Sequence, residues 1–114
     1  MPLLCVTTNI EIAADARDAF VASASQLTAD LLGKPERYVM VQLQTGQAMR
    51  FAGTAEPLAY CELKSIGLPV ERTSDLSQAL GNLILKKLSI PTDRIYIEFS
   101  NAERNMWGWN GTTF

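Results

Sequence analysis

Hydrophobic residues alternate with other residues in two short segments, one near the middle of the chain and one near its end. The apolar positions are Val39, Val41, Leu43, Ile95, Ile97 and Phe99. Such alternation is typical of a β-strand with one buried face. Each apolar residue of the second segment follows its counterpart by 56 positions, and Pro91 follows Pro35 at the same spacing. This spacing indicates an internal repeat.

Two longer segments have the spacing of an amphipathic helix, and they too lie 56 positions apart. Their apolar residues recur at i, i+4 and i+7, as one face of a helix requires. These residues are Phe20, Ala24, Leu27, Leu76, Leu80 and Leu83. We predict helices over residues 15–32 and 73–88, with Asp15 as the N-cap of the first helix. Gly33 and Pro35 form its stop signal.

Each half of the chain therefore has the order strand, helix, strand. The predicted strands cover residues 2–8, 38–44, 58–66 and 94–100. Two parallel strands joined by a helix form a βαβ unit, which is right-handed in nearly all cases. We expect an α+β sandwich, with a four-stranded mixed sheet and both helices on one face. The single domain, 1–114, would consist of pseudo-repeats 2–44 and 58–100 and a C-terminal hairpin, 105–114.

The sheet face that points away from the helices has no remaining layer to cover it. It would carry Tyr38, Met40, Gln42, Tyr96 and Glu98. This set is too aromatic for an open surface and too polar for an ordinary core.

The tail also lacks a partner within the chain. Trp107, Trp109 and Phe114 surround an Asn110-Gly111 pair, which is a strong hairpin signal. Because an isolated hairpin is marginally stable in water, we expect the tail and the bare sheet face to pack against other copies in a closed ring.

Composition and charge exclude several function classes. The net charge is −2 and no basic run occurs, so we expect neither nucleic acid nor an anionic membrane surface as a partner. The chain has no histidine, which excludes a histidine-based catalytic relay and a Cys/His zinc site. The start of the chain has no basic segment before its short apolar run, so we expect no signal peptide and a cytoplasmic location.

The two cysteines, Cys5 and Cys61, lie far apart and form no CxxC motif. We therefore expect reduced thiols, with both residues as small buried hydrophobes at matching strand positions. The connection over residues 45–57 is long enough to be a functional loop. An ordered link between the two halves explains it equally well.

Pro2 is the first candidate for chemistry. Removal of Met1 leaves a secondary amine at the head of a strand, and burial of an amine in an apolar pocket lowers its pKa. A neutral amine can take a proton from a carbon next to a carbonyl and return it elsewhere. The alternative is that proline is simply tolerated as the first residue of a strand.

The other candidate positions also have ordinary structural explanations. Lys34 could anchor a carboxylate, or it could complement the C-terminal end of the first helix. Ser65 and Ile66 could offer a backbone N–H to a substrate oxygen, or they could simply end a strand before Gly67. Aromatic residues of the tail could form pocket walls or pack at an interface.

Taken together, several motifs resemble the macrophage migration inhibitory factor family of the tautomerase superfamily, over essentially the whole chain. The motifs are Pro2, Gly33-Lys34-Pro35, Glu56-Pro57, Ser65-Ile66-Gly67, Asp93-Arg94-Ile95-Tyr96-Ile97 and Gly108-Trp109-Asn110. The resemblance implies a homotrimer with sites at subunit interfaces. It also implies keto–enol tautomerisation of arylpyruvates such as phenylpyruvate, with no metal or cofactor.

The resemblance also implies roles for individual residues. Pro2 would be the catalytic base and acid, while Lys34 and the backbone of Ile66 would bind the carboxylate and oxygen of the substrate. Tyr96 and Glu98 of a neighbouring subunit would reach the pocket, and Ser65 would lie next to it. The apolar walls would come from Tyr38, Trp107, Trp109 and Phe114.

Three departures from the family pattern affect the expected activity. Leu58 stands at the first cysteine of the family's CxxC motif, so we expect no thiol redox activity from Cys61. Glu98 stands where the family's cytokine has asparagine, and its carboxylate would oppose an anionic substrate or be partly protonated. Trp107 replaces a smaller residue and should narrow the mouth of the pocket. We therefore expect slow turnover.

Three other functions compete with this one. The first is a cytokine, or a mimic of one, that binds a receptor and has vestigial tautomerase activity; no sequence feature supports a receptor surface. The second is decarboxylation or hydration-dehalogenation of a small acid, which needs arginines near the proline, for which only Arg50 and Arg94 are candidates. The third is a ferredoxin-like regulatory domain, which would leave the proline start and the tail unexplained.

Overall fold

Two helices pack on one four-stranded sheet in the computed structural model, which describes the whole chain, Met1–Phe114. The main elements are β1 (Leu3–Thr8), α1 (Ala14–Leu32), β2 (Met40–Gln44), β3 (Ala59–Ile66), α2 (Thr73–Leu88), β4 (Ile95–Ala102), β5 (Gly108–Trp109) and β6 (Thr112–Thr113). Four 3-10 turns connect them: η1 (Glu36–Tyr38), η2 (Val70–Arg72), η3 (Thr92–Arg94) and η4 (Arg104–Met106). Neither helix combines the length and apolar character needed to cross a membrane.

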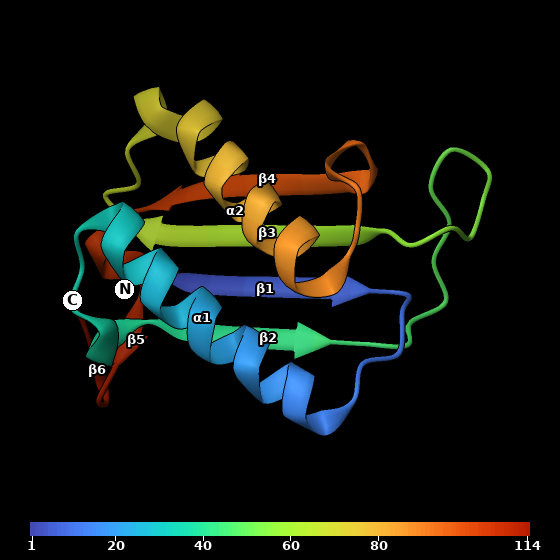
Figure 1. The fold of residues 1–114 in the computed structure, drawn as a ribbon. Helices are drawn as coiled ribbons and strands as arrows, with labels where there is room; N and C mark the ends of the chain where they lie inside the picture. Colours follow the sequence, from blue (N-terminus) through green and yellow to red (C-terminus); the bar gives the residue numbers. More distant parts are fainter.

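The order of the strands in the sheet is β2-β1-β3-β4. β1 and β2 are parallel, as are β3 and β4, while the central pair β1 and β3 is antiparallel. Both helices lie on the same face of the sheet, and the two chain termini lie at the same end (Figure 1). The predicted α+β sandwich is therefore confirmed.

The core lies between the helices and the sheet because alternate residues of the central strands point toward the helices. Leu4 and Val6 of β1 meet Phe20 and Ala24 of α1 in this layer. The second half contributes Cys61, Leu63, Leu76, Leu80 and Ile84, all nearly inaccessible to solvent. The helix faces predicted from the spacing of apolar residues are confirmed.

The predicted N-cap of α1 is wrong. The helix begins at Ala14, with Ala13 as its N-cap and no side-chain capping hydrogen bond. Asp15 instead lies in the first helical turn, where its carboxylate favours the positive end of the helix dipole. Gly33 ends the helix with a φ of 62°, a left-handed conformation that glycine adopts without strain, as the sequence predicted.

The expectation that Cys5 and Cys61 match is also wrong. Leu4 pairs with Val41 and Cys61 pairs with Ile97, so Leu4 is the counterpart of Cys61. A register offset of one residue moves a side chain to the opposite face. Cys5 therefore lies on the face away from the helices, with its Sγ 3.8 Å from the Gln42 side-chain oxygen, whereas Cys61 is buried.

The 45–57 connection is an ordered link, and Arg94 of η3 binds several of its carbonyl groups. The Arg94 guanidinium donates hydrogen bonds to the carbonyl oxygens of Pro57 at 2.9 Å, Glu56 at 3.0 Å, Phe51 at 3.2 Å and Thr54 at 3.4 Å. The guanidinium also lies over the Phe51 ring, 5.2 Å from its centroid. This connection projects from the end of the sheet opposite the termini (Figure 1).

Candidate active site

Pro2 is held rigidly at the head of β1. Its side chain is among the fully buried ones of the molecule, and its carbonyl accepts a hydrogen bond of 3.0 Å from the Met40 backbone N–H. Met1 acylates the Pro2 nitrogen in the full chain, and a tertiary amide of this kind has no basic lone pair. Removal of Met1 would place a secondary amine at this fixed position.

A hollow of about 270 Å³ lies beside Pro2. Eight of the eleven residues that line it are hydrophobic, so it suits an apolar group. Met1, Pro2 and Leu3 contribute from the start of the chain, and Tyr38 from η1. The tail contributes the remaining aromatic residues: Trp107, Trp109 and Phe114.

Aromatic contacts fix the wall of this hollow. Trp109 and Phe114 are stacked, with ring centroids 5.5 Å apart and planes inclined by 19°. Tyr38 meets both rings edge-on, at 6.1 Å from Trp109 and 6.4 Å from Phe114. These geometries are the favourable ones for aromatic pairs, so the three rings hold one another in place.

The hairpin turn explains why the tail reaches the start of the chain. Asn110 and Gly111 have φ values of 53° and 78°, as a two-residue turn with both central residues left-handed requires. The Phe114 N–H donates a hydrogen bond of 3.2 Å to the Trp107 carbonyl, which closes the tail behind the turn.

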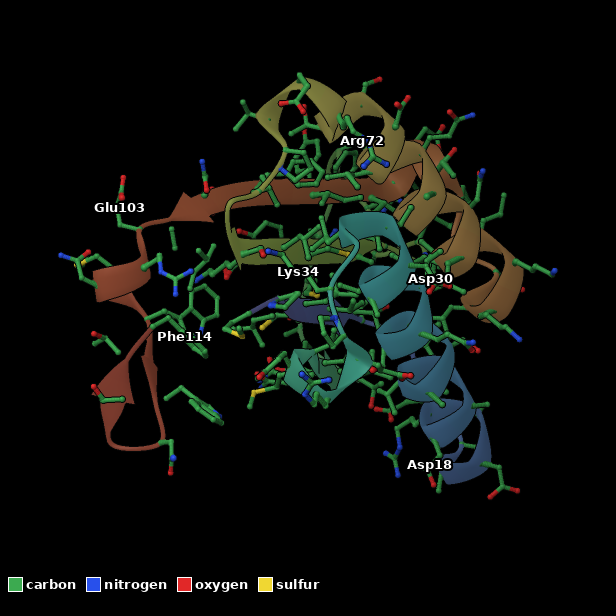
Figure 2. All side chains as sticks on the ribbon, turned by 90° about the vertical axis from the view of Figure 1, so that its left-hand side faces the viewer. Asp18, Asp30, Lys34, Arg72, Glu103 and Phe114 are labelled. Carbon is green, nitrogen blue, oxygen red and sulfur yellow. The ribbon has the colours of Figure 1, made fainter.

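Lys34 places a positive charge near the start of the chain. Its backbone N–H donates to the Ala29 carbonyl at 3.0 Å, so the position of Lys34 is set by the end of α1. Burial, and to a lesser degree the charge of Lys34, lowers the pKa of the Met1 terminal amine below its ordinary value. Figure 2 shows Lys34 and Phe114 at the same end of the molecule.

Arg37 also lines the hollow, and the sequence analysis missed it. Its guanidinium carbon lies 4.7 Å from the centroid of the Tyr38 ring. Arg50 and Arg94, the two arginines predicted as candidates near the motifs, both serve the 45–57 connection. The position of Arg37, directly before Tyr38 and three residues after Lys34, was the signal that could have found it.

Ser65 and Ile66 end β3 beside the start of β1. Lys64 pairs with Leu3, so the antiparallel register continues with Ser65 and Ile66 toward Pro2 and Met1. The Ser65 side chain is buried on the helix side, and its hydroxyl donates to the Ile66 carbonyl at 3.1 Å. Neither residue lines the hollow described above.

Tyr96 and Glu98 are not close to Pro2 within one chain. Tyr96 pairs with Tyr60, which in turn pairs with Thr7 near the far end of β1. Tyr96 is 65% exposed, and its ring packs edge-on against Phe51 at 4.8 Å. Only a second copy of the chain could bring these two residues to the Pro2 hollow.

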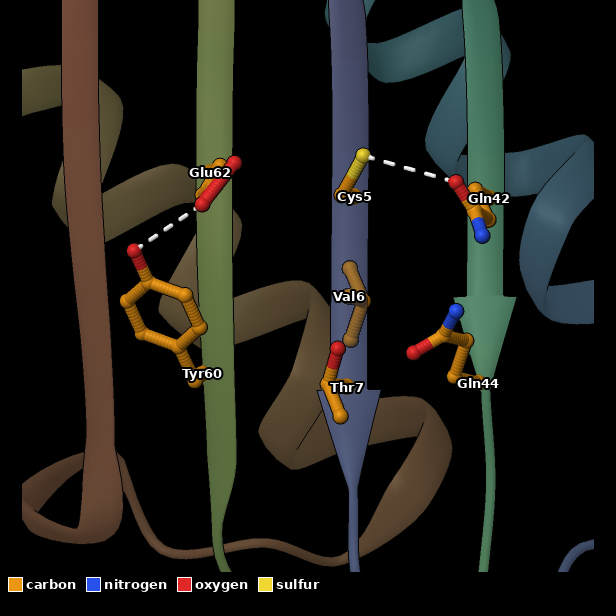
Figure 3. A pocket seen from close by; sticks show the side chains of 7 residues that line it. All are labelled: Cys5, Val6, Thr7, Gln42, Gln44, Tyr60 and Glu62. Atoms are coloured by element: carbon orange, nitrogen blue, oxygen red, sulfur yellow. Dashed lines mark hydrogen bonds between the residues drawn. The ribbon is translucent and has the colours of Figure 1, made fainter. Parts of the chain in front are cut away.

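A smaller hollow of about 150 Å³ lies on the sheet face opposite the helices. Figure 3 shows Tyr60 donating a hydrogen bond of 3.1 Å to Glu62 in this hollow, with Cys5 beside it. Burial and the nearby Glu62 raise the pKa of the Cys5 thiol, and burial raises that of Cys61 to about 12. Both cysteines therefore stay protonated and are poor nucleophiles.

Comparison with known proteins agrees with this architecture. The sequence profile of the family described as macrophage migration inhibitory factor (MIF) matches residues 1–114. A MIF homolog from Trichinella spiralis is 42% identical, with 100% of both chains covered. MIF from Rattus norvegicus is 36% identical, with 100% of this chain and 99% of the relative covered.

Solved structures of related proteins have the same fold. A MIF homologue from Prochlorococcus marinus has a TM-score of 0.93 and 44% identity, with 98% of each chain covered. MIF from Trichinella spiralis has a TM-score of 0.92 and 40% identity, covering 98% of this chain and 99% of the other. These matches confirm the resemblance inferred from the motifs. The chain belongs to the macrophage migration inhibitory factor family.

Proposed function

We propose that the protein is a keto–enol tautomerase of phenylpyruvate-type 2-oxo acids, in which Pro2 acts as general base and acid after Met1 is removed. The observation that supports this most strongly is the position of Pro2. It is fully buried at the head of β1 and lines a largely hydrophobic hollow with aromatic walls.

The chemistry requires an amine that is neutral near physiological pH. The pKa of the Met1 terminal amine is lowered by burial and by the charge of Lys34, and we expect the same two causes to act on a Pro2 amine in the trimmed chain. The neutral nitrogen removes a proton from the carbon next to the 2-oxo group, and that C–H electron pair becomes the C=C bond of the enol. The carbonyl oxygen receives a proton from the ammonium so formed, so atoms and charge balance.

The substrate would lie between the charged and the aromatic parts of the site. Lys34 offers its ammonium to the carboxylate, and the backbone at Ile66 offers a donor to the oxygen. The rings of Tyr38, Trp109 and Phe114 receive the aryl group, for which edge-on and stacked contacts are favourable. The reaction as written uses no metal and no cofactor.

A homotrimer would complete the site. Tyr96 and Glu98 lie far from Pro2 in the same chain, and Met40 and Tyr96 expose 66% and 65% of their surface on the uncovered sheet face. We propose that a neighbouring subunit covers this face and brings its Tyr96 and Glu98 to the hollow. Sedimentation equilibrium should then give three times the chain mass of 12.5 kDa, and a monomer would contradict the proposal.

The direct test of the chemistry replaces the proposed base. Pro2→Gly keeps a residue that permits removal of Met1 but replaces the secondary amine by a primary one on a flexible residue. We expect kcat/KM for phenylpyruvate to fall by about 100-fold, the lower range of general acid–base contributions. Pro91→Gly is the matched control, since it makes the same substitution before η3, at a residue that does not line the hollow, and it should keep near-normal activity.

Two results would contradict the proposal. Unchanged turnover in Pro2→Gly would show that Pro2 is not the base. No turnover by wild-type protein whose mass shows that Met1 has been removed would exclude the enzyme and favour a MIF-like binding protein.

A further inference from the structure

Arg37 contributes the one charged side chain among the residues that line the Pro2 hollow. Its guanidinium forms no salt bridge with an acidic side chain, because the one salt bridge of the structure joins Lys64 to Glu62. An unpaired guanidinium at the rim of an apolar hollow is a binding group for a carboxylate. We infer that Arg37 selects substrates that carry a second anionic group on the aromatic ring, away from the reacting 2-oxo acid.

This inference rests on the proposed function for the orientation of the substrate. Lys34 is the cation whose charge acts on the terminal amine, and Arg37 is not among the causes of that effect. Arg37 lies instead over the Tyr38 ring, which meets Trp109 and Phe114 edge-on. The two cations therefore serve different ends of a bound molecule, with Lys34 at the reacting end and Arg37 at the aryl end.

The stacking on Tyr38 makes Arg37 suited to recognition. A guanidinium that already lies over a ring loses less side-chain freedom when it binds a carboxylate. Because Tyr38 is held by two further rings, the charge has a defined place relative to the aryl-binding wall. The geometry fits an arylpyruvate with a carboxylate at the ring position opposite the side chain.

Arg37 is exposed, so the size of the effect is limited. Solvent-exposed ion pairs contribute about 1 kcal/mol at most, which corresponds to about a fivefold preference. The preference should shrink as ionic strength rises, since salt screens exposed charges.

The first measurement is equilibrium binding, which requires no turnover. Trp107 and Trp109 line the hollow, so quenching of tryptophan fluorescence reports binding of phenylacetate and of 4-carboxyphenylacetate. We expect wild-type protein without Met1 to bind the dicarboxylate about fivefold more tightly than the monocarboxylate. Arg37→Gln should abolish this preference, and Arg37→Lys should keep part of it.

The second measurement is the ratio of kcat/KM for 4-carboxyphenylpyruvate and phenylpyruvate. Arg37→Gln should lower the ratio by raising KM for 4-carboxyphenylpyruvate. Arg17→Gln is the matched control, because it removes the same charge from the exposed start of α1. Arg17→Gln should keep the wild-type preference for the compound with the second carboxylate, both in binding and in kcat/KM.

The outcomes separate this inference from the proposed function. A wild-type protein without a preference for the dicarboxylate, or an Arg37→Gln variant that retains one, overturns the role of Arg37. A preference that depends on Arg37 in a protein without phenylpyruvate turnover supports the binding role and contradicts the tautomerase. Loss of the preference in Arg17→Gln would show a general charge effect and overturn the inference.

Discussion

The 3-10 turns η1 and η3 occupy equivalent places in the two β-α-β units, each after a proline and each before an edge strand. Tyr38 ends η1 and Arg94 ends η3, 56 positions later. Tyr38 faces a hollow, whereas Arg94 binds four carbonyl oxygens of the 45–57 connection. We call the region beside each of these turns a corner. The corner beside η1 is open, whereas the corner beside η3 is filled by the 45–57 connection.

The difference follows from what lies beside each turn. At the first corner the tail contributes Trp109 and Phe114, whose rings meet Tyr38 and form one wall of the hollow. The whole 45–57 connection precedes Ala59 at the head of β3, and it fills the second corner. The comparison teaches that equivalent turns of a repeated fold can serve different purposes, one lining a hollow and the other holding a connection in place.

The largest effect should come from breaking the filled corner. Arg94→Gln removes hydrogen bonds from several carbonyl groups, and we expect the free energy of unfolding to fall by about 3 kcal/mol. Urea denaturation measures this change. Arg50→Gln is the control, since Arg50 donates a single hydrogen bond of 3.1 Å within the exposed part of the connection. Equal stability losses in the two variants would contradict the assigned role of Arg94.

At the open corner, removal of the Lys34 charge should alter activity rather than stability. In Lys34→Gln we expect KM for phenylpyruvate to rise about tenfold, the loss of about 1.4 kcal/mol of carboxylate binding. The charge of Lys34 lowers the pKa of the Met1 terminal amine, and we expect the same effect on the Pro2 amine of the trimmed chain, so removal of this charge should raise the pKa of the Pro2 amine. The acidic limb of the kcat/KM profile should therefore move to higher pH.

Lys86→Gln is the control for this prediction, because Lys86 lies in the last turn of α2 and forms no part of the hollow. A Lys34→Gln profile that moves to lower pH, or does not move, would contradict the proposed effect of Lys34 on the amine. An equal KM change in Lys86→Gln would point to the net charge of the protein.

Smaller effects, in this case increases in kcat/KM, are expected when the two departures from the family pattern, Glu98 and Trp107, are replaced. Glu98→Asn removes a carboxylate that would repel an anionic substrate, and Trp107→Val widens the mouth of the hollow. We expect kcat/KM for phenylpyruvate to rise about threefold in each, on the scale of an exposed charge pair. Steady-state kinetics measures both, and unchanged or lower values would show that these residues do not limit turnover.

Much of the fold was predictable because the spacing of apolar residues along the chain reflects which side chains are buried. The apolar spacing of the strands and helices specified the sheet, the helix faces and the second half of the repeat. The faces of Cys5 and Cys61 were not predictable from spacing alone, because the two inner strands are offset by one residue. Asp15 was misassigned because aspartate is favoured both at the N-cap and in the first turn.

The candidate site was predictable in part. Pro2, Lys34, Tyr38 and the tail aromatics come together at one end of the sheet, as the motifs had indicated. Arg37 was missed because its role depends on the aromatic wall formed by the distant tail, which no local pattern reveals. Tyr96 lies near the far end of the sheet and Glu98 in the middle of β4, so the role that the resemblance implies for them stays a prediction.

The most direct test of the central claim compares two forms of the same protein that differ only in Met1. Ordinary expression provides the trimmed form, and expression with methionine aminopeptidase inhibited provides the form that retains Met1. Intact mass verifies each form, and a phenylpyruvate tautomerase assay measures its turnover. We predict turnover in the trimmed form and none in the form that retains Met1, whose Pro2 nitrogen is an amide. Equal activity in the two forms would contradict Pro2 as the base.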